Sequence, residues 1–255
     1  MLVKLLVCFF AGMGAGIGTG FAGMSAAAVV GPLLITFLDV PAYEAVGIGL
    51  ASDVLASLVS AYTYKKNDNL DIKHGSIMMV FVILFTVLGS YIATHMPNPA
   101  MSGTVIVALL LLGLRFIIKP VATTKEDMLK RSDKQKLVGS IVGGILVGFI
   151  CGFVGAGGGM MMLFVLTSFL GYEIHTAVGT SVFIMAFTAL TGSVSHFLMG
   201  DMPNLEILIF CIAFTFIWAR IASKIANKAS LKTLNRIVGI VLVITSGVII
   251  LVNAL

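Results

Sequence analysis

Long apolar runs separated by short polar segments make up the chain. Six runs each have about the length of one membrane-spanning helix, and they cover 42–64, 76–95, 101–118, 174–198, 205–222 and 237–253. Two further runs, 3–38 and 137–170, contain about 35 residues each. A transmembrane helix needs about 20 residues, so each of these two runs is too long for one span and short for two. The pattern predicts that each forms a helix, a non-helical tip and a second helix.

Glycines mark the expected tip of each long run. The sequence GFVGAGGGM, residues 152–160, holds five glycines in its first eight positions. Glycine destabilises a helix by about 1 kcal/mol relative to alanine, and an unsatisfied backbone group in lipid costs several kcal/mol. Non-helical backbone is tolerated at membrane depth where it lines a cavity or is buried in protein. We therefore expect the breaks, near 20–28 and 152–160, to serve a function.

The two halves of the chain repeat. A shift of 132 residues places 12–50 on 144–182 without a gap, and 11 of the 39 positions are identical. The matched residues of the first half include Gly12, Gly16, Gly20, Phe21, Gly23, Ala45, Val46 and Gly47. The recurrence argues against a signal peptide at the N-terminus, because a cleaved leader has no reason to reappear in the core. We expect a first repeat at 1–120, a linker at 121–136 and a second repeat at 137–255.

Composition assigns the chain to the membrane. Its 255 residues are 59% hydrophobic and 11% charged, with a mean hydropathy of +1.11, whereas a soluble domain is about 25% charged. The lipid bilayer is therefore an expected partner. The cysteines, Cys8, Cys151 and Cys211, lie in apolar stretches without metal-ligand spacing, and we expect them to be core residues. The sequence predicts neither a metal nor a cofactor.

The basic residues indicate the membrane orientation. Of the 16 Lys and Arg residues, 15 fall within 65–73, 115–136 and 220–236, and Lys4 is the exception. These three segments are alternate connections, so the positive-inside rule places them in the cytoplasm and both chain termini outside. This distribution explains the net charge of +5, and we expect no nucleic-acid partner.

The orientation makes the two repeats inverted. The span 42–64 runs inward, whereas its counterpart 174–198 runs outward. Each long run starts and ends on one side, so it either crosses the membrane twice or folds back as a re-entrant hairpin. We predict an all-α integral membrane fold of two inverted-topology repeats, each a broken or re-entrant helix pair followed by three transmembrane helices. Inverted repeats with broken helices are typical of secondary transporters that hold substrate at the midplane.

Two motifs of the second half carry a family resemblance. GFICGFVGAGGG followed by HTAVGTS resembles the TauE/SafE family of sulfite exporters, and the similarity in organisation covers nearly the whole chain. The first half departs from it, because Ser25-Ala26-Ala27 stand where the second half has Gly157-Gly158-Gly159. The resemblance implies the export or uptake of small sulfur-containing anions such as sulfite or sulfonates.

Candidate binding groups follow from the breaks. Glycine lets backbone N–H groups approach a ligand, and the positive end of the helix after a break favours an anion. The expected substrate-binding residues are Gly23, Ser25, Gly155, Gly157, Gly158, Gly159, Thr180 and Ser181. The alternative is that the glycines serve tight helix packing and that the hydroxyls bond back to their own helix.

Asp53 is the carboxylate deepest in a predicted span, about eleven residues into 42–64. Ionisable residues inside a membrane are functional by default, so Asp53 is a candidate for binding a coupling proton or cation. The alternative is a structural group held by Ser52 or Ser57. His196 lies near the outer end of its span, and Glu173 and His175 lie in a cytoplasmic turn, where a histidine is usually solvated.

The sequence thus predicts a secondary transporter of small sulfur-containing anions, such as sulfite or sulfoacetate, in the cytoplasmic membrane. A passive anion channel and a transporter of another anion, such as a carboxylate, remain as alternatives. An intramembrane serine protease built on Ser25 and His196 is disfavoured, because a nucleophile needs a base within hydrogen-bond reach and supporting donors. We expect no enzymatic activity.

Overall fold

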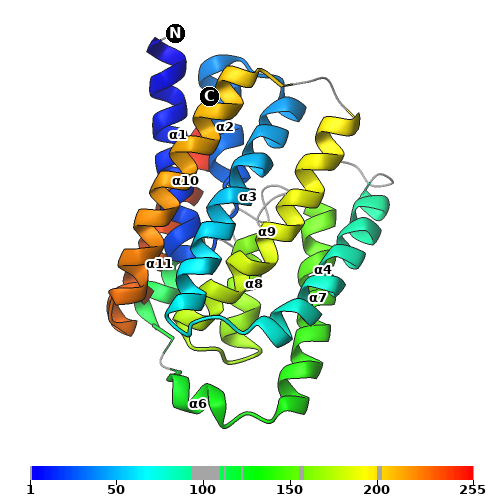
Figure 1. Ribbon diagram of the computed structural model, residues 1–255, viewed down its shortest axis with the longest axis vertical. Helices are drawn as coiled ribbons and strands as arrows, with labels where there is room; N and C mark the ends of the chain where they lie inside the picture. The colour runs from blue at the N-terminus through cyan, green and yellow to red at the C-terminus, as the bar shows by residue number, and fades with distance from the viewer. Residues whose placement is uncertain are drawn as a thin grey trace.

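The structure, a computed structural model, describes residues 2–93, 110–111, 113–121, 123–154, 158–199 and 203–254. These residues contain helices and connecting segments without strands. The helices are α1 (Leu2–Ala22), α2 (Ala27–Leu38), α3 (Ala42–Lys66), α4 (Ile72–Ala93), α6 (Lys125–Leu129), α7 (Asp133–Val154), α8 (Gly158–Ser168), α9 (Ile174–Met199), α10 (Leu205–Lys228) and α11 (Leu231–Ala254) (Figure 1).

Five helices of the described chain, α1, α3, α7, α9 and α10, are long and apolar enough to cross a membrane. Their number and composition make the chain a multi-pass integral membrane protein. The expected spans at 42–64 and 174–198 correspond closely to α3 and α9. The expected span at 101–118 lies largely outside the described residues, although 113–118 are helical.

Three helices extend beyond the predicted spans into charged sequence. The helix α4 begins at Ile72 rather than 76, α10 ends at Lys228 rather than 222, and α11 begins at Leu231 rather than 237. The apolar pattern stops where Lys and Arg appear, but their long side chains let a helix continue to the membrane surface. The expected linker at 121–136 likewise contains α6 and the first turn of α7.

The second helix of each broken run is too short to cross a bilayer by itself. The helix α2 contains 12 residues and is roughly 18 Å long, whereas the apolar part of a bilayer is about 30 Å thick. The helix α8, with 11 residues, is shorter still. Figure 1 shows α1 entering from the end that holds the N-terminus and α7 entering from the end that holds α6.

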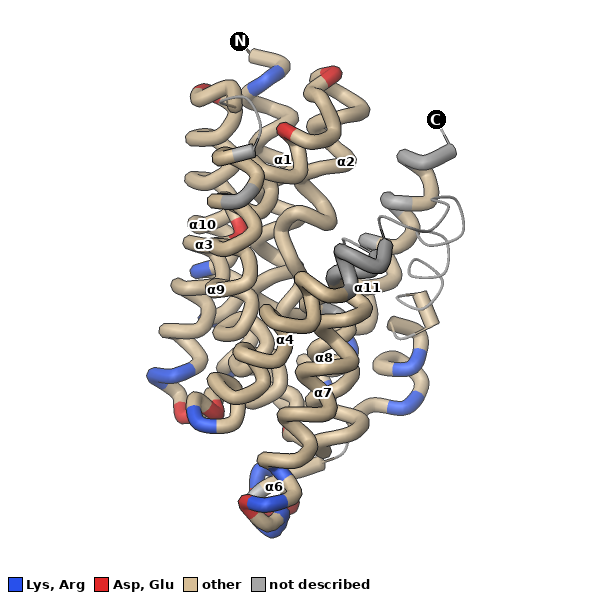
Figure 2. Tube along the Cα trace, turned by 90° about the vertical axis from the view of Figure 1, so that its right-hand side faces the viewer, with Lys and Arg blue, Asp and Glu red and all other residues tan. Residues whose placement is uncertain are grey.

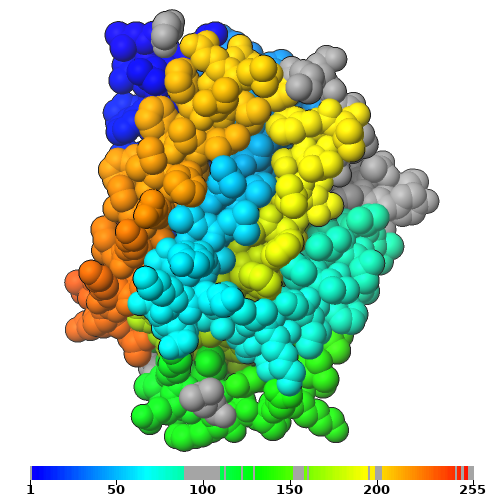
Figure 3. Space-filling view, viewed as in Figure 1, coloured from blue at the N-terminus to red at the C-terminus, as the bar shows by residue number. Residues whose placement is uncertain are grey.

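Helices from the two halves alternate in the packing. The helix α1 packs on α10, α7 packs on α4, and α3 contacts both α9 and α10. Figure 3 shows α10 in orange, α3 in blue to cyan and α9 in yellow side by side on one face.

Four-spaced glycines bring these helices close together. A Cβ atom on Gly16 would come within 2.6 Å of the Thr215 carbonyl oxygen of α10. One on Gly148 would come within 2.5 Å of the Val82 carbonyl oxygen of α4. Small residues allow such backbone contact between membrane helices, so the packing explanation holds for these positions.

The basic connections gather at one end of the molecule, which we call the basic end and define by segments 65–73, 115–136 and 220–236 (Figure 2). Lys125 Nζ donates to the Asp68 carbonyl at 2.5 Å, and Lys73 Nζ lies 2.6 Å from Asp133 Oδ2. At the opposite end, the Asn204 amide donates to Glu44 at 2.8 Å. The ends of α1 and α11 that carry the chain termini also lie there (Figure 1).

Candidate functional site

The first break is a tight turn between α1 and α2. Gly23 adopts a left-handed conformation, with φ of +61°, which glycine adopts without strain and which commonly ends a helix. The free carbonyls at the end of α1 find partners: the Tyr64 hydroxyl donates to the Gly20 carbonyl at 2.9 Å. The Thr19 hydroxyl lies 2.9 Å from the Met24 carbonyl oxygen. The break is therefore narrower than the predicted 20–28, because α1 continues to Ala22.

Asp53 of α3 caps the start of α2. The residue before α2, Ala26, has no side chain that could cap the helix. The Asp53 carboxylate instead lies close to the Ala26 amide and the Ser25 hydroxyl and accepts a hydrogen bond from the Ser57 hydroxyl at 2.8 Å. Asp53 is 1% exposed. A carboxylate at a helix N-terminus is stabilised by the free N–H groups and the helix dipole.

The second break lies between α7 and α8. The predicted binding residues Gly155 and Gly157 lie outside the described residues. Gly158 and Gly159 are the first residues of helix α8, which corrects the expectation of a non-helical tip reaching 160. Their lack of a side chain serves close approach, because a Cβ on Gly158 would meet Cys151 Sγ and one on Gly159 would meet Met185 Sδ.

The two breaks meet. A Cβ on Gly159 would also contact the Gly23 carbonyl oxygen, and a Cβ on Gly23 would contact the Ser181 hydroxyl of α9. Segments more than 130 residues apart in the chain thus touch through backbone atoms, with Gly23, Gly159 and Ser181 buried. Only small residues permit this contact.

The two hydroxyl residues of α9 point to different surroundings. The Ser181 hydroxyl donates to the Val178 carbonyl at 2.8 Å, as expected for a hydroxyl that bonds back to its helix, and it also faces Gly23. Thr180 Oγ1 accepts the Asp71 amide at 3.2 Å. Thr180 therefore contacts the start of α4, and the structure does not bring it to the meeting point of the breaks.

The breaks differ in charge. The shift of 132 residues that aligns the repeats places Met185 on Asp53. At the first break the Asp53 carboxylate caps α2, whereas at the second break the Met185 thioether lies against Gly159. An anion near the start of α2 would meet a carboxylate if Asp53 is ionised, whereas at the start of α8 it would meet an uncharged side chain.

A groove of about 830 Å³ runs between α7 and α8 near the basic end. It is lined by residues such as Arg131, Lys134, Val138, Val142 and Phe169. None of its lining residues belongs to either break, so its size alone does not make it the candidate site.

Two features of the site region were not predicted from the sequence. Tyr64 is fully buried and ties α3 to the first break, although its position beside Lys65 suggests a membrane surface. Glu173 and His175 are also buried, at 4% and 8% exposure, which corrects the expectation of a solvated turn. His196 stacks edge-on against Tyr43, with ring centroids 4.3 Å apart, and is half-buried.

The chain is similar to known membrane proteins. Two proteins of Bacillus subtilis (strain 168), the "Probable membrane transporter protein" YunE and the "Probable membrane transporter protein" YdhB, are each 24% identical to the chain. The YunE match covers 90% of this chain and 88% of YunE, and the YdhB match covers 83% and 86%. No solved structure matches the chain significantly. The family model described as "Sulfite exporter TauE/SafE" matches residues 8–249. With nearly its whole length matched, the chain belongs to the TauE/SafE family of membrane transporters.

Proposed function

We propose that the chain is a secondary transporter of small anions that contain oxidised sulfur, such as sulfite and sulfonates, in the cytoplasmic membrane. The observation that carries the proposal is the contact between the two helix breaks, at Gly23 and Gly159. Broken helices that meet inside a membrane are where secondary transporters bind substrate. The description of the family as sulfite exporters favours a sulfur anion.

The packing supports two inverted repeats. The first helix of each half packs on the fourth helix of the other half, α1 on α10 and α7 on α4. The glycines at these contacts match in the repeat, because Gly16 corresponds to Gly148. Such reciprocal pairs are what a pseudo-twofold axis between the halves would produce.

We place the anion at the start of α8. Its ligands would be the backbone amides of Gly158 and Gly159 and the Ser181 hydroxyl, which would turn from the Val178 carbonyl to the anion, with Gly23 closing the site. The N–H groups and dipole of a helix start attract an anion. Asp53 already caps α2, so we assign Asp53 and Ser25 to holding the first break in shape.

The orientation follows from the charges. The basic end would face the cytoplasm, and both chain termini would lie outside. The substrate would then reach the breaks from either side in turn, as one half moves against the other.

Flux into vesicles tests the proposal. Purified protein in liposomes should take up sulfite with a rate that saturates and that responds to an imposed ion gradient. Flux that rises linearly with concentration and ignores such gradients would indicate a passive channel. Flux of acetate without flux of sulfite or sulfoacetate would contradict the sulfur assignment.

A further inference from the structure

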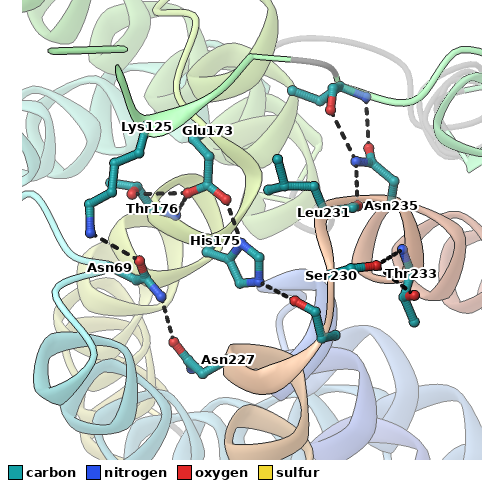
Figure 4. Close-up of polar contacts among 12 residues, drawn as sticks. Asn69, Lys125, Glu173, His175, Thr176, Asn227, Ser230, Leu231, Thr233 and Asn235 are labelled. Carbon is teal, nitrogen blue, oxygen red and sulfur yellow. Dashed lines mark hydrogen bonds and ion pairs between the residues drawn. The ribbon is translucent and has the colours of Figure 1, made fainter. Parts of the chain in front are cut away.

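A buried carboxylate and imidazole join two helices at the basic end. Glu173 precedes α9, and its Oε1 contacts His175 Nδ1. The other ring nitrogen, Nε2, lies 3.1 Å from the carbonyl oxygen of Ala229, which ends α10. Figure 4 shows the imidazole between these two acceptors.

Helix capping explains only part of this arrangement. Glu173 Oε2 accepts the Thr176 amide at 3.1 Å and faces the Thr176 hydroxyl at 3.3 Å. A carboxylate in this position caps α9. Capping needs no histidine and no contact with α10, so the bridge from His175 to Ala229 calls for a separate explanation.

The contacts fix the number of protons on the pair. A neutral imidazole has one N–H group, yet both ring nitrogens of His175 face oxygen acceptors, from Glu173 and Ala229. Two protons are therefore needed: one donated from Nε2 to the carbonyl, and one shared between Nδ1 and the carboxylate. With both protons the pair is neutral overall.

Loss of one proton breaks the bridge. The pair then has a net charge of −1, and its remaining proton stays between His175 and the carboxylate, the stronger acceptor. Nε2 keeps a lone pair that faces the lone pairs of the Ala229 carbonyl oxygen. The contact between α9 and α10 changes from attractive to repulsive.

Titratable groups near the pair also come from α3, α6 and α10. From α3, Tyr64 lies close enough to interact electrostatically with Glu173. From α6, Lys125 donates to Asn69 at 3.4 Å, and Asn69 in turn donates to Asn227 of α10 at 2.8 Å. Lys228, in the last turn of α10, is exposed.

The contacts of Glu173 favour its ionised form. Burial opposes ionisation, but the hydrogen bonds and charge of His175 and the Thr176 amide lower the pKa of Glu173 below its usual range. The shared proton therefore resides mainly on the ring.

We propose that Glu173 and His175 form a proton-binding site that closes the basic end while it carries two protons and releases α10 when it loses one. The released proton passes to cytoplasmic water, and α9 and α10 separate. The site deepens the proposed function, on which it rests, because it would couple a proton to access from the cytoplasm.

Labelling of a buried cysteine tests the proposal without any substrate. Ala177 is fully buried one turn into α9, so a cysteine placed there by A177C, in protein whose three native cysteines are replaced, reports opening beside the pair. Its rate with a small thiol reagent is divided by that of K130C, an exposed position, to remove the effect of pH on thiol reactivity. The ratio should rise about tenfold from about pH 6 to about pH 8.5, as expected for loss of one charge-assisted hydrogen bond.

Two variants and one matched control complete the experiment. E173Q combined with A177C should label at one low ratio at both pH values, because the amide that replaces the carboxylate can donate to Nδ1 and leave the ring proton on Nε2 for the Ala229 carbonyl. H175Q combined with A177C should label at one ratio at both pH values, because it has no imidazole to gain or lose the proton. D133N is the matched control, because it also removes a carboxylate that contacts a histidine, His74, at 3.2 Å, but at an exposed position away from the pair. It should keep the pH response. An unchanged ratio in the parent, or a pH response that survives in E173Q or H175Q, would overturn the proposal. The proposed transport of sulfur anions is tested separately, by the vesicle assay, so the two proposals can fail independently.

Discussion

At the scale of single residues, glycine serves three different purposes. Gly23 supplies a left-handed conformation, Gly148 lets α7 touch the backbone of α4, and Gly159 lets α8 touch the first break. The sequence shows the same residue type in all three places. Only the neighbours, which are distant in the chain, decide which purpose applies.

Substituting Gly148 by alanine should destabilise the protein by about 1–3 kcal/mol. The added Cβ would come within 2.5 Å of the Val82 carbonyl oxygen and 2.9 Å of its Cα, and backbone atoms cannot rotate away. Gly247→Ala is the matched control, because among the described residues no atom outside its own helix turn lies within 4 Å of a Cβ there. Thermal unfolding in detergent measures both variants, and equal midpoints would contradict the close packing of α7 on α4.

Asp71 should contribute stability that disappears in acid. Burial opposes its ionisation, but hydrogen bonds from the His74 amide, the Tyr172 hydroxyl and the His74 ring hold the pKa of Asp71 below its usual range. A carboxyl group with a depressed folded-state pKa stabilises the protein above its unfolded value, about 3.9 for Asp, and loses this effect as the pH falls through the folded value. The stability difference between wild type and Asp71→Asn should therefore be smaller below about pH 4 than at about pH 5. Urea unfolding across this range measures it; a difference that grows in acid would contradict the assignment.

Part of the candidate site could be predicted at this scale. The glycine run located the second break, because glycine is costly in a helix and needs a reason. The capping of α2 by Asp53 could not be predicted, since the two lie on different helices and the contact depends on their packing. The burial of His175 was missed for the same reason: α10, which covers it, is distant in the chain.

At the scale of helices, the sequence predicted where the spanning helices lie better than which helices pack against each other. Apolar runs identified α3 and α9, and the glycine-rich tips identified the breaks between α1 and α2 and between α7 and α8. The hydrophobic pattern does not predict that α1 packs on α10, a helix of the other half. A repeat predicts that corresponding helices make corresponding contacts, but it does not predict which helices form them.

The native Cys8 and Cys211 test the packing of α1 on α10. Both side chains belong to one buried cluster between α1 and α10, whereas Cys151 lies on α7. Mild oxidation should form one intramolecular disulfide, and the number of thiols that react after denaturation should fall from three to one. Mass spectrometry of the peptides identifies the pair. Persistence of all three thiols would contradict the packing of α1 on α10.

At the scale of the whole molecule, the charges define two ends. The three basic segments lie far apart in the sequence, yet contacts such as Lys73 with Asp133 bring them to one end. This arrangement could be predicted, because alternate loops of a membrane protein lie on one side and the basic ones face the cytoplasm.

Cysteines at the two ends should differ in their reaction with a membrane-impermeant maleimide. In intact cells, with the native cysteines replaced, Ala42→Cys should react because it lies at the end opposite the basic end, and Lys130→Cys should react only after lysis. Both positions are exposed, so burial does not confound the comparison. Reaction of Lys130→Cys alone in intact cells would reverse the proposed orientation.

The central claim, an anion held at the start of α8, is tested most directly by ligand-dependent thermal stabilisation of wild type, Met185→Asp and Met185→Leu. A ligand at one hundred times its Kd stabilises a protein by about 2.7 kcal/mol. Sulfite or sulfoacetate should raise the unfolding temperature of wild type and of Met185→Leu. Met185→Asp should lose the shift, because it places a carboxylate at the second break in the position that Asp53 has at the first. A shift of wild-type size in Met185→Asp, or no shift in wild type with any sulfur anion, would contradict the account.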